Sequence, residues 1–322
     1  MAAPETPGAD SPPSVTRVEI DVDTRAPGGT TNAYVVDGLL VDPAARTESL
    51  DRAIGLGGPS SGAGGGSEVG GDTAADAVGG DAAADEIDAI AVTHTHPDHV
   101  GAVAVYAEVT GAVVVAHADH VDRFASATGV EPDDTVRDGD RVGGTGVRAI
   151  ETPGHASDHV AFAVENASGR REGDGEGGGP HRELLCGDLA VAEGSVVVGA
   201  PDGDLREYLD SLERVRDAGF DRLHPGHGPA IVDPAATCRR LIEHRLDREE
   251  SVRAAVDGGA ADVDAVVDAA YEKDLTGVSD LARATVVAHL EKLLTEGRID
   301  ESWTARLARE PEDSGTDATA KR

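Results

Sequence analysis

The feature that most constrains this chain is a short apolar run that leads directly into a cluster of histidines. The run EIDAIAV is typical of a buried strand, and it is followed at residues 94–99 by HTHPDH. His94 and His96 stand two positions apart, so on an extended backbone their side chains point to the same side. Asp98 and His99 follow at the expected start of a helix and point toward a second position. This stretch predicts a metal-binding turn at the end of a strand.

Three later segments repeat the pattern of a strand, a tight turn and a ligand-type side chain. His155 stands in TPGHASDH, Asp188 in CGDLAV and His227 in HPGHGP. A hydrolytic metal ion needs about three protein ligands and an open position for water, so two ions need more ligands than HTHPDH supplies. Loops at strand ends are where binding residues usually gather. We therefore expect these segments to complete the site that HTHPDH begins.

The series HxHxDH, PGH, GD and PGHG resembles the full ligand series of the metallo-β-lactamase fold superfamily. It is most similar to the hydrolase branch that includes glyoxalase II, and the resemblance covers about residues 15–233. It implies an α+β fold, the αββα metallo-β-lactamase sandwich. It also implies that one zinc ion is bound by His94, His96 and His155, that a second is bound by Asp98, His99 and His227, and that Asp188 bridges both.

The resemblance also implies the chemistry of a metal-dependent hydrolase. We expect two Zn²⁺ ions, with iron or manganese as alternatives, and a hydroxide that bridges them. Zinc lowers the pKa of bound water to about 7, so no separate strong base or nucleophilic side chain is required. Asp98 is the candidate catalytic residue, because its carboxylate can steer the attacking water or protonate the leaving group.

Other polar residues near these motifs are interpreted as structural. His159 is assigned to packing in preference to a role as hydrogen-bond donor to a ligand, and His224 to ordering of its loop. His117 and His120 match no position of the ligand series, so we expect a solvated helix start there. Asn32, in TTNAYVV, is interpreted as a turn residue.

Glycine-rich and acidic stretches divide the chain. Residues 1–14 are predicted to be disordered, and two flexible insertions are expected at about residues 57–86 and 168–183, where apolar residues are scarce. Between these stretches the pattern alternates strands with helices. The predicted catalytic domain spans residues 15–233 and ends at the dipeptide DP.

The remainder of the chain has a helical pattern. Helices are expected at residues 235–256, 261–272 and 279–296, and the segment RIDES is expected to start a strand. Three helices and a short strand are the outline of a winged helix, which we predict for residues 234–310, before a disordered tail at 311–322. This part resembles the winged-helix appendage of the lactamase-beta-like protein 2 group, in which the metal domain cleaves RNA or is an uncharacterised hydrolase.

The net charge of the chain indicates the kind of environment in which the protein is expected to function. There are 61 Asp and Glu residues against 28 Lys and Arg, a net charge of −33, and lysine is nearly absent. This composition resembles that of cytosolic proteins of extreme halophiles, in which molar salt screens the repulsion between carboxylates. The N-terminal residues lack the basic and apolar regions of a signal peptide, and no apolar run is long enough to span a membrane. We expect a soluble, cytoplasmic, halophilic protein.

Three functions remain open on sequence alone. The first is a dinuclear zinc hydrolase of an ester, a thioester or a phosphodiester, with RNA as one candidate substrate. The second is a glyoxalase II-like hydroxyacyl-thioester hydrolase, or a sulfur dioxygenase with one iron ion. The third is a non-catalytic winged-helix protein that binds nucleic acid, although the arginines of residues 235–256 alternate with acids. We expect no membrane partner and leave a homodimer open.

Overall fold

The structure is a computed structural model that describes residues 13–56, 87–165, 181–271 and 275–308. The chain divides into two compact units. The first comprises Met1–Glu151, Val160–Gly187 and Phe220–Val232. The second comprises Thr152–His159, Asp188–Gly219 and Asp233–Arg322. The predicted insertion at residues 57–86 and the predicted tail at 311–322 lie outside the described residues.

The first unit contains a six-stranded sheet with the order β1-β2-β3-β4-β5-β6. Its strands are β1 (Thr16–Asp21), β2 (Thr30–Val36), β3 (Leu39–Val41), β4 (Ala89–Ala91), β5 (Val113–His117) and β6 (Asp134–Val136). The first three strands run antiparallel, and β3 to β6 run parallel. The short parallel strands β3 and β4 are buried along their whole length, which explains their uninterrupted apolar sequences.

A second sheet in this unit has the order β10-β9-β8-β7. Its strands are β7 (Arg148–Glu151), β8 (Val160–Glu165), β9 (Arg182–Gly187) and β10 (Arg222–Pro225). Strand β8 is antiparallel to β7 and β9, while β9 and β10 are parallel. Strands β7, β9 and β10 therefore all end at the same edge of this sheet.

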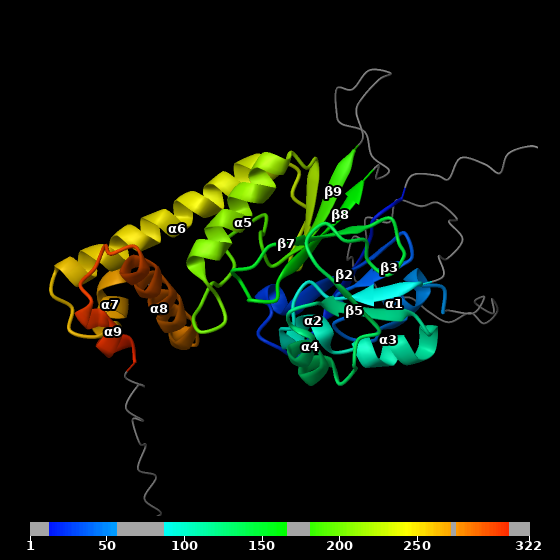
Figure 1. Ribbon diagram of the computed structural model, residues 1–322, viewed down its shortest axis with the longest axis horizontal. Helices are drawn as coiled ribbons and strands as arrows, with labels where there is room; N and C mark the ends of the chain where they lie inside the picture. The colour runs from blue at the N-terminus through cyan, green and yellow to red at the C-terminus, as the bar shows by residue number, and fades with distance from the viewer. Residues whose placement is uncertain (1–12, 57–86, 166–180, 272–274, 309–322) are drawn as a thin grey trace, which may run out of the picture. The chain divides into compact units, whose positions relative to one another are not determined.

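The core of the first unit lies on both faces of the six-stranded sheet. One cluster joins the two sheets and includes Tyr34, Phe162 and Leu185. On the other face, Leu50 and Tyr106 pack with strand residues under a layer of helices (Figure 1). The helices of this unit are α1 (Glu48–Ala53), α2 (Pro97–Val100), α3 (Val103–Thr110) and α4 (Val121–Thr128), besides the single turn η1 (Pro27–Gly29).

Two segments differ from what their sequence suggests. The apolar residues of NAYVVDGLLVD suggest one continuous strand, but this segment forms the hairpin of β2 and β3. Asp37 and Gly38 have φ values of 50° and 73°, the left-handed turn that an Asp-Gly pair favours between two strands. Most of the insertion predicted at 168–183 lies outside the described residues, but its end is wrong, because Arg182 and buried Glu183 belong to β9 and Glu183 pairs with Val164 of β8.

The second unit is built from helices. They are α5 (Leu205–Ala218), α6 (Pro234–Asp257), α7 (Val263–Ala270), α8 (Ser279–Thr295) and α9 (Ser302–Leu307). The Asp204, Asp233 and Asp262 side chains cap α5, α6 and α7 by accepting backbone N–H bonds. An apolar cluster that includes Val252, Leu290 and Trp303 packs the C-terminal helices together. The three helices predicted after residue 234 are therefore present as α6, α7 and α8.

The strand expected from RIDES is not formed, so that part of the winged-helix prediction is wrong. The described residues after α8 contain the short helix α9 and no strand. The Asp300 side chain accepts the backbone N–H of Ser302, and the Asp300 carbonyl accepts that of Trp303. Trp303 is 3% exposed, so burial of its ring stabilises a helical turn in place of a wing.

Within the part of the chain that the structure describes, no helix combines the length and the apolar character that crossing a bilayer requires.

Candidate metal centre

The HTHPDH segment follows β4 and runs into α2. His94 and His96 occupy the turn, and Pro97 at the first helical position starts α2, which carries Asp98 and His99. The Nε2 atom of His94 lies 3.0 Å from the Nδ1 atom of His96. His94 and His99 are 1% and 0% exposed, so the short helix turns its ligand-type side chains inward.

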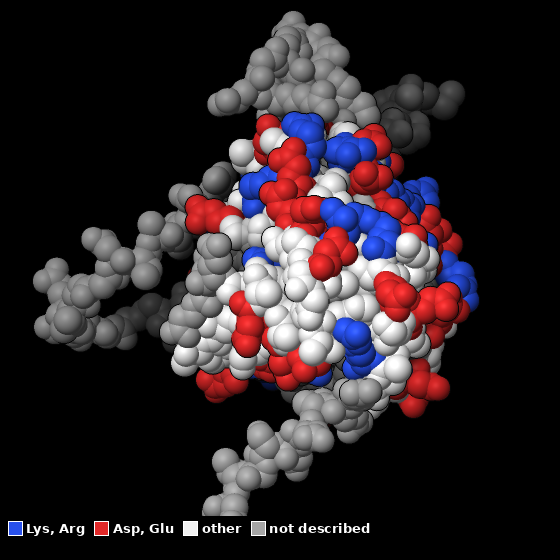
Figure 2. All heavy atoms as spheres, turned by 90° about the vertical axis from the view of Figure 1, so that its left-hand side faces the viewer, with Lys and Arg blue, Asp and Glu red and all other residues white. Residues whose placement is uncertain are grey.

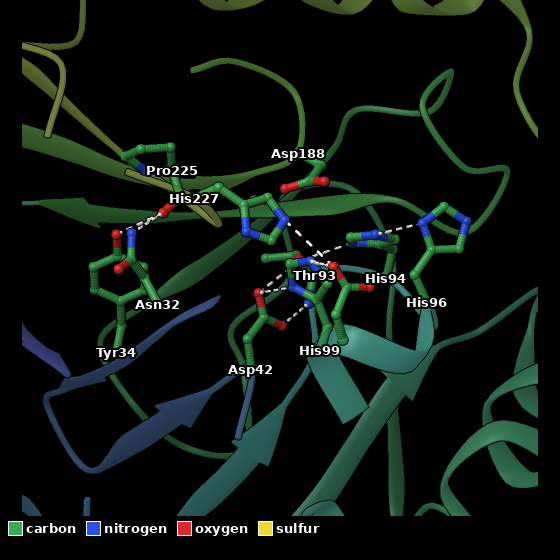
Figure 3. A network of polar contacts seen from close by, with 12 residues as sticks. Asn32, Tyr34, Asp42, Thr93, His94, His96, His99, Asp188, Pro225 and His227 are labelled. Carbon is green, nitrogen blue, oxygen red and sulfur yellow. Dashed lines mark hydrogen bonds and ion pairs between the residues drawn. The ribbon is translucent and has the colours of Figure 1, made fainter. Parts of the chain in front are cut away.

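Asp42, directly after β3, orients this segment (Figure 3). One carboxylate oxygen accepts the backbone N–H of Thr93 at 2.6 Å. The other accepts the Thr93 hydroxyl at 2.8 Å and the Nδ1–H of His99 at 2.9 Å. Because the hydroxyl donates to Asp42, its oxygen accepts the Nδ1–H of His94 at 3.1 Å. Asp42 thereby fixes both imidazoles in the tautomer whose Nε2 atom carries the lone pair.

His227 follows β10 and is fixed in the same way. Its Nδ1–H donates to the carbonyl of Thr30 at 2.7 Å, so its Nε2 atom carries the lone pair. That atom lies 3.5 Å from an Asp98 carboxylate oxygen, and the same oxygen lies 3.9 Å from Nε2 of His99. Donor atoms of Asp98, His99 and His227 all lie within 4.8 Å of one another, as the ligands of one ion would.

The loop that carries His227 is bound to β2 by Asn32 and Tyr34. The Asn32 amide donates to the carbonyls of Pro225 and Gly228 at 2.9 and 2.8 Å, and the Tyr34 hydroxyl donates to Pro225 at 2.7 Å (Figure 3). Burial raises the pKa of Tyr34 well above its usual value, so the hydroxyl keeps its proton. The interpretation of Asn32 as a turn residue is wrong, because it lies within β2 and positions this loop.

The second unit brings His155 and Asp188 together. Nε2 of His155 lies 3.6 Å from an Asp188 carboxylate oxygen, and Nδ1–H of His155 donates to the carbonyl of Val197 at 2.6 Å. Nε2 of His159 accepts the backbone N–H of Asp188 at 3.1 Å, so its Nδ1–H donates to the Thr152 hydroxyl at 2.8 Å. His159 therefore orients Asp188, and its assignment to simple packing is wrong.

Three of the candidate ligands follow strands that end at the same edge of the four-stranded sheet. His155 follows the end of β7, Asp188 the end of β9 and His227 the end of β10, and these three strands end together. The carbonyl of Thr93, beside His94, accepts the N–H of Val160 at 2.8 Å at the start of β8, where β7 ends. The HTHPDH segment thus lies at that same edge.

The separations between donor atoms within each unit suit ligands of a divalent metal ion. Two ligands of a tetrahedral zinc ion stand about 3.3 Å apart when each bond is about 2.0 Å long. The donor separations of 3.0 Å for His94 and His96, 3.5 Å for Asp98 and His227, and 3.6 Å for His155 and Asp188 agree with that spacing. Imidazole and carboxylate donors suit zinc, iron and manganese alike, so the donor set does not choose among them.

The remaining histidines of the motifs have structural contacts. His224 lies within β10 and not in the loop it was expected to order; its Nε2 atom contacts Glu183 at 2.6 Å, and Nε2 of His181 contacts the same carboxylate at 2.8 Å. Burial raises the pKa of Glu183, but the hydrogen bonds from both rings lower it below its usual value. His117 ends β5 and contacts Glu151 at 3.1 Å, so the expected helix start is wrong for this residue, whereas His120, partly exposed, stands at the start of α4.

Comparison with protein families and with curated proteins gives consistent matches. Residues 26–169 match the family model described as the metallo-beta-lactamase superfamily. A Beta-lactamase-like protein 2 homolog of Drosophila melanogaster is 29% identical over 68% of this chain and 72% of its own length. An atrochrysone carboxyl ACP thioesterase of Aspergillus fumigatus is 28% identical over 52% of this chain, which spans only 46% of that relative.

Solved structures share the fold. A metallo-beta-lactamase family protein from Thermus thermophilus superimposes with a TM-score of 0.61 at 24% identity. The superposition covers 88% of this chain and 94% of the other. At this level of identity the likeness concerns the fold alone.

Proposed function

We propose that this protein is a metal-dependent hydrolase with two metal ions, because residues 26–169 match the family model of the metallo-beta-lactamase superfamily. The observation that carries the proposal is the orientation of the imidazoles. Hydrogen bonds from Nδ1 to Asp42, Thr30 and Val197 leave Nε2 of His99, His227 and His155 with the lone pair that binds a metal.

We assign the ligands as the motif series implies. One ion would be held by His94, His96 and His155, the other by Asp98, His99 and His227, and Asp188 would contact both. The assignment is supported by the strand ends that lead into His155, Asp188 and His227, which share one edge of the four-stranded sheet. Zinc is the proposed metal, with iron or manganese as alternatives.

Bound divalent ions would lower the pKa of water and polarise the oxygen of the scissile group. The chain itself would orient the ligands and move one proton. Asp98 directs Oδ2 toward His99 and His227, so Oδ1 is the oxygen that we assign to proton transfer. This carboxylate is 15% exposed, which lets it reach water and a substrate leaving group.

For the substrate we favour a thioester over RNA. The Aspergillus fumigatus relative bears the name of a thioesterase. A nucleic-acid-binding surface usually shows a basic stripe. In Figure 2 basic and acidic side chains are interspersed over the face shown, around an area without charged residues. Within α6, Arg253 is engaged by Glu250 at 2.7 Å, so part of its positive charge is already compensated.

The test is an activity panel in molar KCl, run on the full chain after metal analysis. A hydroxyacyl or acyl thioester, bis-p-nitrophenyl phosphate and single-stranded RNA are compared. We expect thioester hydrolysis that Asp98→Ala reduces at least 100-fold, since general acid–base groups contribute about that much or more. Asp88→Ala is the matched control, because Asp88 is an exposed carboxylate of the same unit.

Each other result selects a different function. Hydrolysis of RNA alone would replace the thioester with a phosphodiester substrate and leave the hydrolase proposal intact. One bound iron ion with oxygen consumption would point to the sulfur dioxygenase. Metal-loaded protein without any activity sensitive to Asp98→Ala would contradict the hydrolase and favour a non-catalytic binding protein.

A further inference from the structure

Helix α6 contacts the loop that begins with the candidate ligand Asp188. The Arg240 guanidinium donates to three carbonyls of this loop, those of Val191 at 2.8 Å, Ala192 at 3.1 Å and Gly194 at 2.6 Å. The loop has no regular secondary structure from residue 188 to 199. The arginine therefore supplies the hydrogen-bond donors that these carbonyls would otherwise find in a sheet or a helix.

A second arginine of α6 continues the contact farther along the same loop. Arg245 is 3% exposed and donates to the carbonyl of Val196. The next carbonyl, that of Val197, accepts the Nδ1–H of His155 at 2.6 Å. The two arginines thus contact the loop between its two functional ends, the Asp188 carboxylate and the carbonyl that orients His155.

Tyr208 of α5 joins both ligand loops of this unit. Its hydroxyl donates to the carbonyl of Leu189, the residue after Asp188, at 2.9 Å, and its ring lies 5.6 Å from the Arg245 guanidinium. On the other side, the backbone of Gly154 approaches Tyr208 so closely that a Cβ on the glycine would lie 2.2 Å from the Tyr208 nitrogen. Asp188 and His155 are therefore both supported by the same helices.

We propose that Arg240 and Arg245 are positioning residues for the metal centre, and that α6 thereby holds Asp188 and His155 in the geometry that binds metal. This inference rests on the proposed function, since it concerns ligands of the proposed ions. A fixed, planar guanidinium suits the role because it donates several bonds from one rigid group to a loop. The C-terminal helices then contribute to the centre through α6, whether or not they contact a substrate.

The test measures metal binding by the full-length protein, independently of turnover. Arg240→Met keeps the length and apolar stem of the side chain but removes every hydrogen bond to the loop. Arg239→Met is the matched control, because Arg239 is the exposed neighbour on the same helix. Zinc stoichiometry and affinity come from chelator competition, coordination geometry from the visible spectrum of the Co²⁺-loaded protein, and folding from circular dichroism and thermal melting.

We expect Arg240→Met to stay folded, to bind at least one ion about tenfold more weakly and to change the Co²⁺ spectrum, since supporting contacts of metal ligands are worth about 10–100-fold in affinity. Arg240→Lys should recover part of the loss, and Arg239→Met should match the wild type. If Arg240→Met binds both ions with wild-type affinity and spectrum, the positioning role is wrong.

Two further results are decisive. Should Arg240→Met fail to fold, Arg240→Lys decides, because lysine keeps the positive charge but lacks the planar group that donates to three carbonyls of the loop. The proposal then stands if Arg240→Lys binds metal more weakly than the wild type and fails if it does not. A wild-type protein that binds no metal contradicts the proposed function itself, whereas equal binding by wild type and variants contradicts only the role of α6.

Discussion

Asp42 occupies a backbone conformation that few side chains adopt, and it does so at the centre of the hydrogen-bond network. Its φ is 53°, and it precedes Pro43, which disfavours helical backbone at the preceding position. Such a conformation costs about 1–3 kcal/mol. The cost is offset because this one carboxylate, 1% exposed, orients both Thr93 and His99.

We expect Asp42→Asn to weaken metal binding by about 10–100-fold. Asparagine tolerates the left-handed backbone as aspartate does, so the change isolates the carboxylate from the turn. The NH₂ group of the asparagine cannot accept a hydrogen bond. It would face either the Thr93 N–H or the His99 Nδ1–H, both of which donate to the Asp42 carboxylate in the wild type. Chelator competition measures the loss, with Asp88→Asn as the exposed control. Unchanged zinc affinity would show that Asp42 only stabilises the fold.

The candidate ligands could be predicted residue by residue because each follows an apolar run and a tight turn in the sequence. Asp42 has the same signal, an acid directly after LLV, but it matched no position of the ligand series and was overlooked. The sequence predicts the wrong role for His159, because its two contacts, with Thr152 and with the backbone of Asp188, depend on the folded loop. The positions of the ligands can be predicted from short local motifs, whereas the residues that orient the ligands are brought to them only by tertiary contacts.

At the scale of elements, the loop before His155 depends on its fit to α5. Gly154 has a φ of 129°, and its Cβ would approach Tyr208 backbone atoms within 2.3 Å. Ser211 of the same helix donates to the carbonyl of Pro153 at 2.8 Å. Loop and helix are therefore in backbone contact, and only glycine permits it.

Gly154→Ala should destabilise the protein by about 3 kcal/mol or more, the sum of backbone strain and overpacking. It should also weaken metal binding, since His155 is the next residue. Gly219→Ala is the matched control, because Gly219 ends the same helix with a φ of 70° and open space at its Cβ. For this control we expect the free energy of unfolding, measured by urea denaturation, to fall by only about 1 kcal/mol. Equal losses in the two variants would mean that the contact with Tyr208 has no special role.

Helix α8 carries a histidine that should make stability depend on pH. His289 is 0% exposed, and within the described part of the chain neither ring nitrogen has a hydrogen-bond partner. Burial, and then the charges of Arg245, Arg248 and Lys292, lower its pKa from 6.5 to about 3. The unfolded chain therefore binds a proton below pH 6.5 that the folded chain binds only near pH 3, so stability falls as the pH decreases through this window.

His289→Leu should remove this dependence. When the pH is lowered from 7.5 to 5, the free energy of unfolding of the wild type should fall by about 2 kcal/mol more than that of the variant. Well below pH 6.5 this difference should grow by about 1.4 kcal/mol per pH unit. Urea unfolding at the two pH values measures the difference. His120→Asn, at a partly exposed site, should keep the wild-type dependence. A His289→Leu protein as sensitive to acid as the wild type would refute the prediction.

Elements with a long periodic pattern were easier to predict than short ones. The helices α6, α7 and α8 follow from their apolar spacing and from Asp233 and Asp262 at two of their starts. The β2–β3 hairpin was missed although Asp37 and Gly38 form a favoured turn, because apolar residues continue on both sides of it. RIDES follows the helix end at Gly297, where a winged helix would start a strand, but burial of Trp303 makes the next turn helical.

At the scale of the whole molecule, charge is the dominant property. A net charge of −33 over 322 residues gives a self-repulsion that opposes the compact state at low ionic strength. Repulsion between surface carboxylates extends over about 10 Å in 0.1 M salt and about 3 Å in 1 M salt. Few cations are present to offset it, since the chain has only 28 lysines and arginines in total.

We expect the melting temperature to rise by several degrees between 0.1 M and 2 M KCl, with most of the rise complete by about 1 M, where screening is nearly full. Sucrose at equal osmolality is the control for general solute exclusion. A variant with fewer charges should melt higher in 0.1 M KCl and respond less to added salt. Four exposed carboxylates are amidated in it, by Asp88→Asn, Asp210→Asn, Glu243→Gln and Asp268→Asn. A melting temperature that stays constant or falls across the KCl series would refute adaptation of this chain to molar salt.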